Sequence, residues 1–318
     1  MYRISPENIN KHIDEISSLR IGTYKSFFKT GSDEEAYGIY CWNSEISSRI
    51  NLAIGIYEVI LRNRIHKTLS KFFFKNKRKF CSGILNGTAE SCDWYNHIST
   101  TSKFSSYVKR EITDEQGNLL SPPPYPHQIV SRLSHGKWRY AFKVTTTLNG
   151  NLIPWDVLLQ EVFSEYRSDF KKPSVQEAVF SRIKQVHLLR NRIAHFEPVW
   201  KFGELKNEAG NKVIKAAPKN TLECLGRTKK EYKYIVDIIS WISSDMSTFY
   251  QQTRNHAETL ELLELNAINS FKGKSQKLEI DISSDSLAQE IEDAMSKSKQ
   301  RNNTITLVKD GKTVANLR

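Results

Sequence analysis

Apolar residues recur at helical spacing along the chain that follows its first forty residues. From Ile46 to Leu69 they fall three or four positions apart, which makes one face of a helix apolar and the other polar. The residues on this face are Ile46, Ile50, Ala53, Ile54, Tyr57, Ile60, Leu61, Ile65 and Leu69. Asn43 or Ser44 is expected to cap the start of the helix. The pattern predicts one long amphipathic helix here.

Two other segments carry the same periodicity. Val175 to Phe196 and Lys229 to Tyr250 are each predicted to form one helix. The apolar stripe of the first comprises Val179, Ile183, Val186, Leu189 and Ile193. Pro198 disfavours helical backbone at Glu197, so this helix is expected to end near His195 or Phe196.

Shorter elements connect these helices. Gln128 to Val144 has a helical pattern with an expected break at Gly136, and Trp155 to Phe170 reads as another amphipathic segment. Consecutive prolines make Ser121 to His127 an extended loop. Asn207 to Asn220 is also predicted to be a loop.

The last forty-five residues differ in character. Residues 277–283 alternate as a strand does, residues 286–299 suit a short helix, and residues 304–318 read as a hairpin with Asp310-Gly311 at its turn. The predicted fold is therefore mainly α, a helical bundle with a small α+β C-terminal appendage. The expected divisions are an N-terminal lead-in (1–36), a helical domain (37–272) and the α+β tail (273–318).

Charge narrows the class of partner. The chain has 318 residues, with 47 Lys and Arg against 35 Asp and Glu, a formal net charge of +12. This surplus favours a polyanion such as nucleic acid or an anionic membrane surface, but a merely basic protein has the same charge. The first residues lack a secretory signal, and no apolar run is long enough to span a bilayer. The four cysteines lack metal-ligand spacing, so we expect free thiols, no metal, no other cofactor, no membrane association and a cytoplasmic location.

The segment "LLRNRIAHFEPVW" carries the candidate chemistry. Asn191 and His195 are four residues apart and so share a helix face, with Arg190 beside them and away from the apolar stripe. An imidazole can carry the proton of a ribose 2′-hydroxyl or of a leaving 5′-oxygen. A permanently charged, forked guanidinium can bind the scissile phosphate. This combination suits RNA cleavage without a metal. A second copy of the site in a homodimer would supply the second proton-transfer group.

The same segment resembles the signature of the Abi-like (abortive infection) proteins, a branch of the HEPN ribonuclease superfamily. Two other blocks are similar to that family: "YCWNSEISSRINLAIGIYEVILRNRI" and "VSRLSHGKWRYAF". With the helix from Lys229, the resemblance extends roughly from Tyr37 to Arg254. It implies a HEPN-type helical bundle and a metal-independent endoribonuclease that acts as an antiphage or toxin–antitoxin effector. Its implied partners are an RNA substrate such as tRNA or mRNA, a second copy of the chain, and an antitoxin of small RNA or protein.

The resemblance also implies roles for individual residues. Arg190 corresponds to the phosphate-binding arginine, Asn191 to the polar second residue and His195 to the catalytic histidine. Many members have a second histidine where this chain has Phe196, which removes an auxiliary proton carrier. Glu197, at the exit of the helix, is a supporting candidate.

A near-copy, "ILRNRIHKTL", runs from Ile60 to Leu69, but its His66 comes one residue too early for the motif. A structural role is favoured for this copy, with Glu58 and Arg62 one turn apart as an ion pair. The alternative is that Glu58 or Arg62 lies beside the catalytic helix and orients its arginine. His187, three residues before that arginine, either faces the same cleft or is an ordinary helix residue.

Two further features have alternative interpretations. The segment "KFFFKNKRKF" either grips RNA through Lys75, Lys77, Arg78 and Lys79 or is a solvated helix end whose phenylalanines belong to the core. The tail resembles the helix and hairpin of Phd/YefM-type antitoxins, or is an unrelated appendage.

Two other functions compete with RNA cleavage. One is a non-catalytic RNA-binding HEPN protein that regulates a defence system. The other is a structural protein whose basic face binds an acidic partner. Salt-dependent RNA binding without cleavage would mark the first, and the second predicts no RNA affinity.

Overall fold

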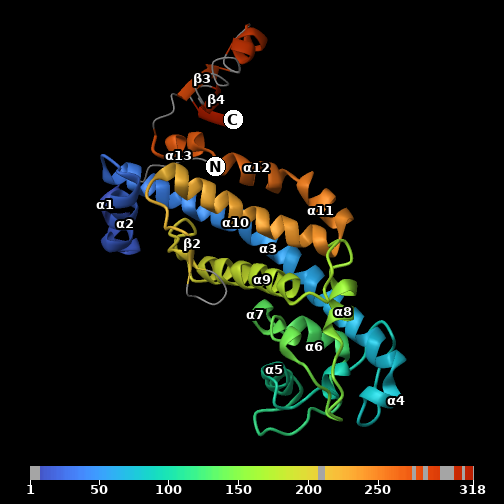
Figure 1. Ribbon diagram of the computed structural model, residues 1–318. Helices are drawn as coiled ribbons and strands as arrows, with labels where there is room; N and C mark the ends of the chain where they lie inside the picture. The colour runs from blue at the N-terminus through green and yellow to red at the C-terminus, as the bar shows by residue number, and fades with distance from the viewer. Residues whose placement is uncertain are drawn as a thin grey trace. The chain divides into compact units, whose positions relative to one another are not determined.

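Helices dominate the chain, which confirms the predicted mainly α fold (Figure 1). The structure is a computed structural model that describes residues 8–206, 212–273, 277–281, 286–293, 304–309 and 312–317. It divides into two compact units. The first comprises residues 1–50, 195–230 and 254–318, and the second comprises residues 51–194 and 231–253.

Two long helices contribute residues to both units, α3 (Asp33–Lys75) and α10 (Thr221–Ile242). The other helices of the first unit are α1 (Ile9–Ile16), α2 (Ser18–Phe28), α12 (Arg254–Leu262) and α13 (Leu265–Phe271). Its strands are β1 (Leu205–Lys206), β2 (Val213–Lys215), β3 (Lys277–Asp281), β4 (Thr304–Lys309) and β5 (Lys312–Leu317). The helices of the second unit are α4 (Lys77–Phe80), η1 (Trp94–Asn96), α5 (Lys103–Ile112), α6 (Pro126–Arg132), α7 (His135–Trp138), η2 (Ala141–Lys143), α8 (Trp155–Val162), α9 (Pro173–Ala194) and α11 (Ser244–Gln251).

The predicted apolar face of α3 is buried at each of its nine positions except Ile60, which is half-buried. The helix begins at Asp33, earlier than predicted, and its first turn holds three acids that favour a helix N-terminus. The expectation that Asn43 or Ser44 caps its start was wrong. Both lie inside the helix, where the Asn43 side-chain oxygen accepts a hydrogen bond from the backbone N–H of Val199 at 3.0 Å.

Helix α9 ends at Ala194, within two residues of the predicted end. Its side chains Val179, Ile183, Val186 and Leu189 are buried. Arg182 joins α9 to α10, because its guanidinium pairs with Asp237 at 3.6 Å and lies 3.5 Å from the ring centroid of Tyr234. These contacts hold one flank of α9 in the core of the second unit and leave another flank for the motif.

Three predicted boundaries need correction. The helix expected from Lys229 to Tyr250 begins earlier and is interrupted at Ser243, whose side chain caps α11 by accepting a hydrogen bond from the Met246 N–H. Gly136 does not break a helix but lies inside α7, and the break comes at residues 133–134. The segment predicted as a loop over 207–220 contains β2, paired with β1; its residues 207–211 lie outside those described.

A helix-and-sheet arrangement makes up the tail, as predicted. Strand β4 lies between β3, to which it is parallel, and β5, to which it is antiparallel. Residues 287–293 are helical, and Leu287 and Ile291 pack on Ile280 with Leu307. The Asp310-Gly311 turn and residues 294–299 of the expected helix lie outside the described residues. The domain boundary near residue 273 stays a prediction.

Aromatic side chains build the centre of the first unit. The buried Trp200 ring lies 5.2, 4.7 and 4.8 Å from the ring centroids of Tyr24, Phe27 and Phe28. The indole N–H of Trp42 donates to the carbonyl of Leu262 at 2.7 Å, which fixes α3 to the end of α12. Over the described ranges, every helix is too short or too polar to cross a bilayer.

Candidate functional site

The Arg190–His195 motif spans the end of α9. Asn191 belongs to its last turn and Arg190 directly precedes that turn, both in the second unit, and His195 is the first residue after the helix, in the first unit. The division between the two units falls between Ala194 and His195. The motif therefore has one set of surroundings in the second unit, up to Ala194, and another in the first unit, from His195.

Arg190 is half-buried and has no ion pair or hydrogen bond with any residue that the structure describes. Its neighbour Asn191 is also half-buried, and its side-chain Nδ2 lies 3.2 Å from Nε2 of His187, one helical turn earlier. An amide nitrogen can only donate, so His187 Nε2 accepts and its ring proton lies on Nδ1. His187 thus fixes the orientation of Asn191 and faces the motif, as one of the two interpretations of this residue expected.

The turn that contains α7 packs against this flank of α9. The His135 ring centroid lies 5.6 Å from that of His187, and the Tyr57 hydroxyl lies 3.0 Å from His135 Nε2. The backbone N–H of His135 donates to Glu58 Oε1 at 2.8 Å. A contact chain therefore runs from Glu58 through His135 and His187 to Asn191. Glu58 holds the start of α7, and no hydrogen bond or ion pair joins it to Arg190 among the described residues, as the alternative to a structural role would require.

Burial and nearby positive charge both favour the neutral form of these two imidazoles. Burial, followed by the charges of His187, Arg190 and Arg139, lowers the pKa of His135 to about 3. Burial, followed by Arg139 and Arg190, also lowers the pKa of His187. Arg139 and Arg190 both contribute to the lowered pKa of the same two rings, so two positive charges lie near them. An anion is the ligand that this environment favours.

His195 and Glu197 are exposed, and neither forms a hydrogen bond or an ion pair within the described part of the chain. Between them Phe196 has a left-handed backbone (φ 54°) and an 80% exposed side chain. The Phe196 carbonyl accepts a hydrogen bond from Arg20 Nη1 at 3.0 Å. A left-handed residue just past a helix reverses the chain direction, a position where glycine is preferred. This turn starts the path that carries the chain from His195 to the buried Trp200.

In the near-copy of the motif, the histidine has a structural role. His66 is buried, accepts a hydrogen bond from the Trp94 indole N–H at 3.0 Å, and lies 2.9 Å from the Ser91 hydroxyl. The expected Glu58–Arg62 ion pair is absent among the described residues. Arg62 instead donates to the carbonyl of Ser131 at 3.4 Å, because Glu58 is taken up by the start of α7. Burial lowers the pKa of His66 to about 4, with a smaller contribution from His127.

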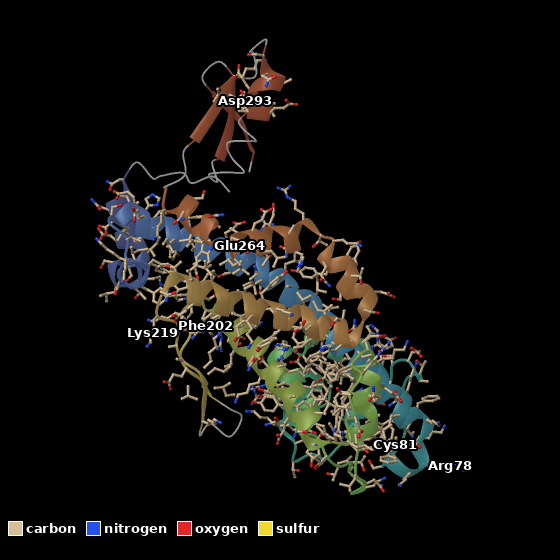
Figure 2. The ribbon with its side chains drawn as sticks, turned by 45° about the horizontal axis from the view of Figure 1, so that its top comes forward. Arg78, Cys81, Phe202, Lys219, Glu264 and Asp293 are labelled. Atoms are coloured by element: carbon tan, nitrogen blue, oxygen red, sulfur yellow. The ribbon has the colours of Figure 1, made fainter. Side chains whose placement is uncertain are left out.

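The basic segment at the end of α3 divides by residue type. Phe73 and Phe80 are buried, whereas the four basic residues, Lys75, Lys77, Arg78 and Lys79, are exposed. Figure 2 shows Arg78 on the outer side of α4. Two of the phenylalanines therefore belong to the core, as the solvated-helix interpretation expects. Contact of the basic residues with RNA stays a prediction.

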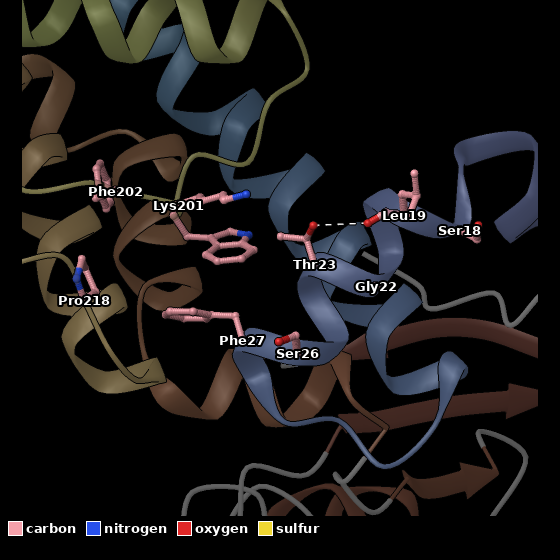
Figure 3. A pocket seen from close by; sticks show the side chains of 10 residues that line it. Ser18, Leu19, Gly22, Thr23, Ser26, Phe27, Lys201, Phe202 and Pro218 are labelled. Atoms are coloured by element: carbon pink, nitrogen blue, oxygen red, sulfur yellow. Dashed lines mark hydrogen bonds between the residues drawn. The ribbon is translucent and has the colours of Figure 1, made fainter.

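A pocket of about 660 Å³ lies in the first unit, between α2 and the segment that starts at Trp200 (Figure 3). Phe27 and Trp200 form an aromatic wall, and Thr23 also lines the pocket while its hydroxyl donates to the Leu19 carbonyl at 3.2 Å. None of the predicted site residues lines this pocket.

Sequence reasoning missed His135, Arg139 and Tyr57 as neighbours of the motif. Their signal was present, because His135 and Arg139 lie inside the segment "LSHGKWRY" that carries part of the family resemblance. Gly136 of this segment is required by a close approach, since a Cβ there would lie 2.8 Å from His187 Cε1.

In the described part of the chain, no three His, Cys, Asp or Glu side chains gather as metal ligands do.

Comparison with known proteins gives the class. The chain matches the Abi-like protein family over residues 10–201, more than half of its length, and therefore belongs to that family. The match begins within the predicted lead-in and includes α9, the α7 segment and the whole Arg190–His195 motif. No curated protein and no solved structure matches the chain. The family associates the chain with abortive infection.

Proposed function

We propose that this protein is a metal-independent endoribonuclease of the HEPN type, which acts as an antiphage or toxin–antitoxin effector. The observation that supports this most is Arg190: a half-buried residue whose guanidinium has no ion pair or hydrogen bond in the described chain, one residue before an oriented Asn191. A guanidinium without a partner in the protein is available to an anionic ligand, and a phosphodiester is such a ligand.

The chemistry assigns one task to each residue. Arg190 holds the scissile phosphate and stabilises the negative charge that its oxygens gain in the transition state. The ribose 2′-oxygen attacks phosphorus, its proton passes to an imidazole, and the bond from phosphorus to the 5′-oxygen breaks with proton donation to that oxygen. The products are a 2′,3′-cyclic phosphate and a 5′-hydroxyl end.

His195 is the proton carrier in this proposal, and Asn191 orients the phosphate. One imidazole serves as base or acid, so a second proton carrier is needed, and a homodimer supplies His195 from a second copy. His187 is a positioning residue. Burial lowers its pKa and so favours the neutral ring, which can accept the Asn191 hydrogen bond.

Activity of this kind must be restrained in the cell that makes it. We infer an antitoxin, either a protein or a small RNA, with the basic chain favouring the RNA. A tRNA or an mRNA is the proposed substrate.

The test in cells is induced expression of wild type, Arg190→Ala, His195→Ala and the control Lys184→Ala, an exposed residue of the same helix. Total RNA is sequenced for new 5′-hydroxyl ends. We expect growth arrest and new ends in wild type and Lys184→Ala, and neither in the two motif variants. Arrest that persists in both motif variants would contradict the catalytic assignment. RNA bound without new ends would indicate the non-catalytic RNA-binding protein instead.

A further inference from the structure

Helix α5 and the α7–η2 segment are joined by a row of charged and aromatic side chains. Lys103, Tyr107 and Glu111 follow one another at four-residue spacing on one face of α5. Opposite them, Lys137 pairs with Glu111 at 2.8 Å and lies 5.8 Å from the Tyr107 ring centroid. The rings of Tyr107 and Tyr140 are 5.8 Å apart. One end of this row is thus neutralised by a carboxylate.

The other end carries positive charge alone. Lys103 Nζ lies 4.6 Å, the Arg139 guanidinium carbon 4.7 Å and Lys143 Nζ 5.8 Å from the ring centroid of Tyr140. The Tyr140 hydroxyl accepts hydrogen bonds from Lys103 at 3.3 Å and from Arg139 at 2.8 Å. None of the three cations has a carboxylate within ion-pair distance in the part of the chain that is described. We name this group, Lys103, Arg139, Tyr140 and Lys143, the Tyr140 cluster.

Concentrating three cations around one neutral ring is unfavourable in the free protein, because like charges repel. The hydrogen bonds from Lys103 and Arg139 lower the pKa of the Tyr140 phenol, which reports the same positive field. Basic side chains interleaved with a partly exposed aromatic ring are typical of surfaces that bind single-stranded nucleic acid: phosphates meet the cations, and a base stacks on the ring.

Arg139 connects this cluster to the motif. Its charge lowers the pKa of both His135 and His187, and Arg190 does the same. The two guanidiniums are therefore both close to one pair of imidazoles, whose ring centroids lie 5.6 Å apart. An RNA strand whose scissile phosphate meets Arg190 has neighbouring phosphates within reach of this second positive centre.

We propose that the Tyr140 cluster is a phosphate-binding subsite, which holds the RNA strand beside Arg190. The inference rests on the proposed ribonuclease function and names a binding determinant that the Arg190–His195 motif does not include. Lys103 and Lys143 contact backbone phosphates of single-stranded RNA, and Tyr140 offers its ring to a base.

The test compares two double variants in the full-length His195→Ala protein, which keeps the RNA intact. Lys103→Gln/Lys143→Gln removes two charges from the cluster, and Lys109→Gln/Arg110→Gln removes two exposed charges of the same helix outside it. Binding to a fluorescein-labelled single-stranded RNA of mixed sequence is measured by anisotropy from 0.05 to 0.5 M KCl. Thermal melting verifies that each variant folds as its parent does.

Each lost phosphate contact lowers the slope of log K against log [salt] by about 0.7 on a single strand, so the cluster variant should lose about 1.4. If the variant and its parent bind RNA equally at 1 M salt, the variant should therefore bind about 25-fold more weakly than its parent at 0.1 M. The control variant should keep the slope of its parent. Equal changes in the two variants would overturn the subsite, because bulk charge would then explain binding. Equally salt-dependent binding to poly-glutamate would overturn it too, since the ligand would be any acidic polymer.

RNA cleavage is then measured for the same double variants in the protein that keeps His195. This measurement separates the proposed subsite from the proposed ribonuclease activity. Cleavage by wild type with no difference between the double variants refutes the subsite and leaves the ribonuclease proposal standing. A specific loss of slope in a protein that does not cleave RNA supports the subsite as a binding surface and refutes the ribonuclease proposal.

Discussion

Replacing Gly136 by alanine tests the contact between α7 and α9 on which the description of the motif depends. A Cβ at residue 136 would lie 2.8 Å from Cε1 and 3.6 Å from Nδ1 of His187. The first distance is too short for two carbon atoms, so either the imidazole or the backbone of α7 must move. A moving imidazole gives up its hydrogen bond with Asn191.

The expected cost follows from these two ways of relaxing. Loss of one hydrogen bond destabilises by about 0.5–1.5 kcal/mol, and overpacking at a fixed backbone costs about 1–3 kcal/mol. Because the clash involves the end of a side chain, we expect Gly136→Ala to lower the free energy of unfolding by about 1–2 kcal/mol. RNA cleavage should fall with it, since Asn191 loses its support.

Urea unfolding of a double-mutant cycle measures this effect. His187→Ala removes the atoms that the new Cβ would meet, so Gly136→Ala should cost about 1 kcal/mol less in that background. The control is Gly55→Ala, at an exposed position of α3 where a Cβ meets nothing within 4 Å. It should stabilise by about 0.5–1 kcal/mol, because alanine is the better helix former. If Gly136→Ala were as harmless as Gly55→Ala, or cost the same with and without His187, the packing of α7 on α9 would be refuted.

Two further predictions concern stability. Phe196→Gly should raise the unfolding free energy by about 1 kcal/mol, since the left-handed backbone strains phenylalanine and its exposed ring packs little; thermal melting that shows no gain contradicts this. Because the pKa of His66 falls from 6.5 to about 4 on folding, only the unfolded chain binds its proton in that range. Stability is therefore present above pH 6.5 and lost as pH falls toward 4, by about 3 kcal/mol in all. His66→Gln, which can still accept from Trp94, should flatten this dependence in urea titrations at pH 7 and 4.5, and an unchanged pH dependence speaks against a buried neutral His66.

Much of the helical framework could be predicted from periodicity. The apolar stripes of α3 and α9 mark their buried faces, and Pro198 marks the end of α9 to within two residues. Boundaries set by side-chain capping were harder to predict. Asn43 is a residue type that often caps helices, but its side chain accepts a hydrogen bond from the backbone N–H of Val199, which is distant in sequence. Ser243 caps a new helix, α11, although the apolar pattern continues unbroken through this position.

The candidate site was predictable only in part. Arg190, Asn191 and His195 are close in sequence, so their spacing was enough to single them out. The support from Glu58 and His135, and the gathering of Lys103 with Arg139 around Tyr140, join elements that are 36 to 77 residues apart. Such contacts depend on packing between helices, which helical spacing within one segment does not specify.

The measurement that tests the central claim most directly is cleavage of RNA by the purified protein in EDTA, followed by analysis of the product ends. The account predicts 2′,3′-cyclic phosphate and 5′-hydroxyl ends from wild type, with rates lower by about 10²–10⁴ in His195→Ala and by about 10²–10³ in Arg190→Ala. Lys184→Ala should cleave as wild type does. Cleavage that requires a divalent metal, or that proceeds at full rate without His195, would contradict it.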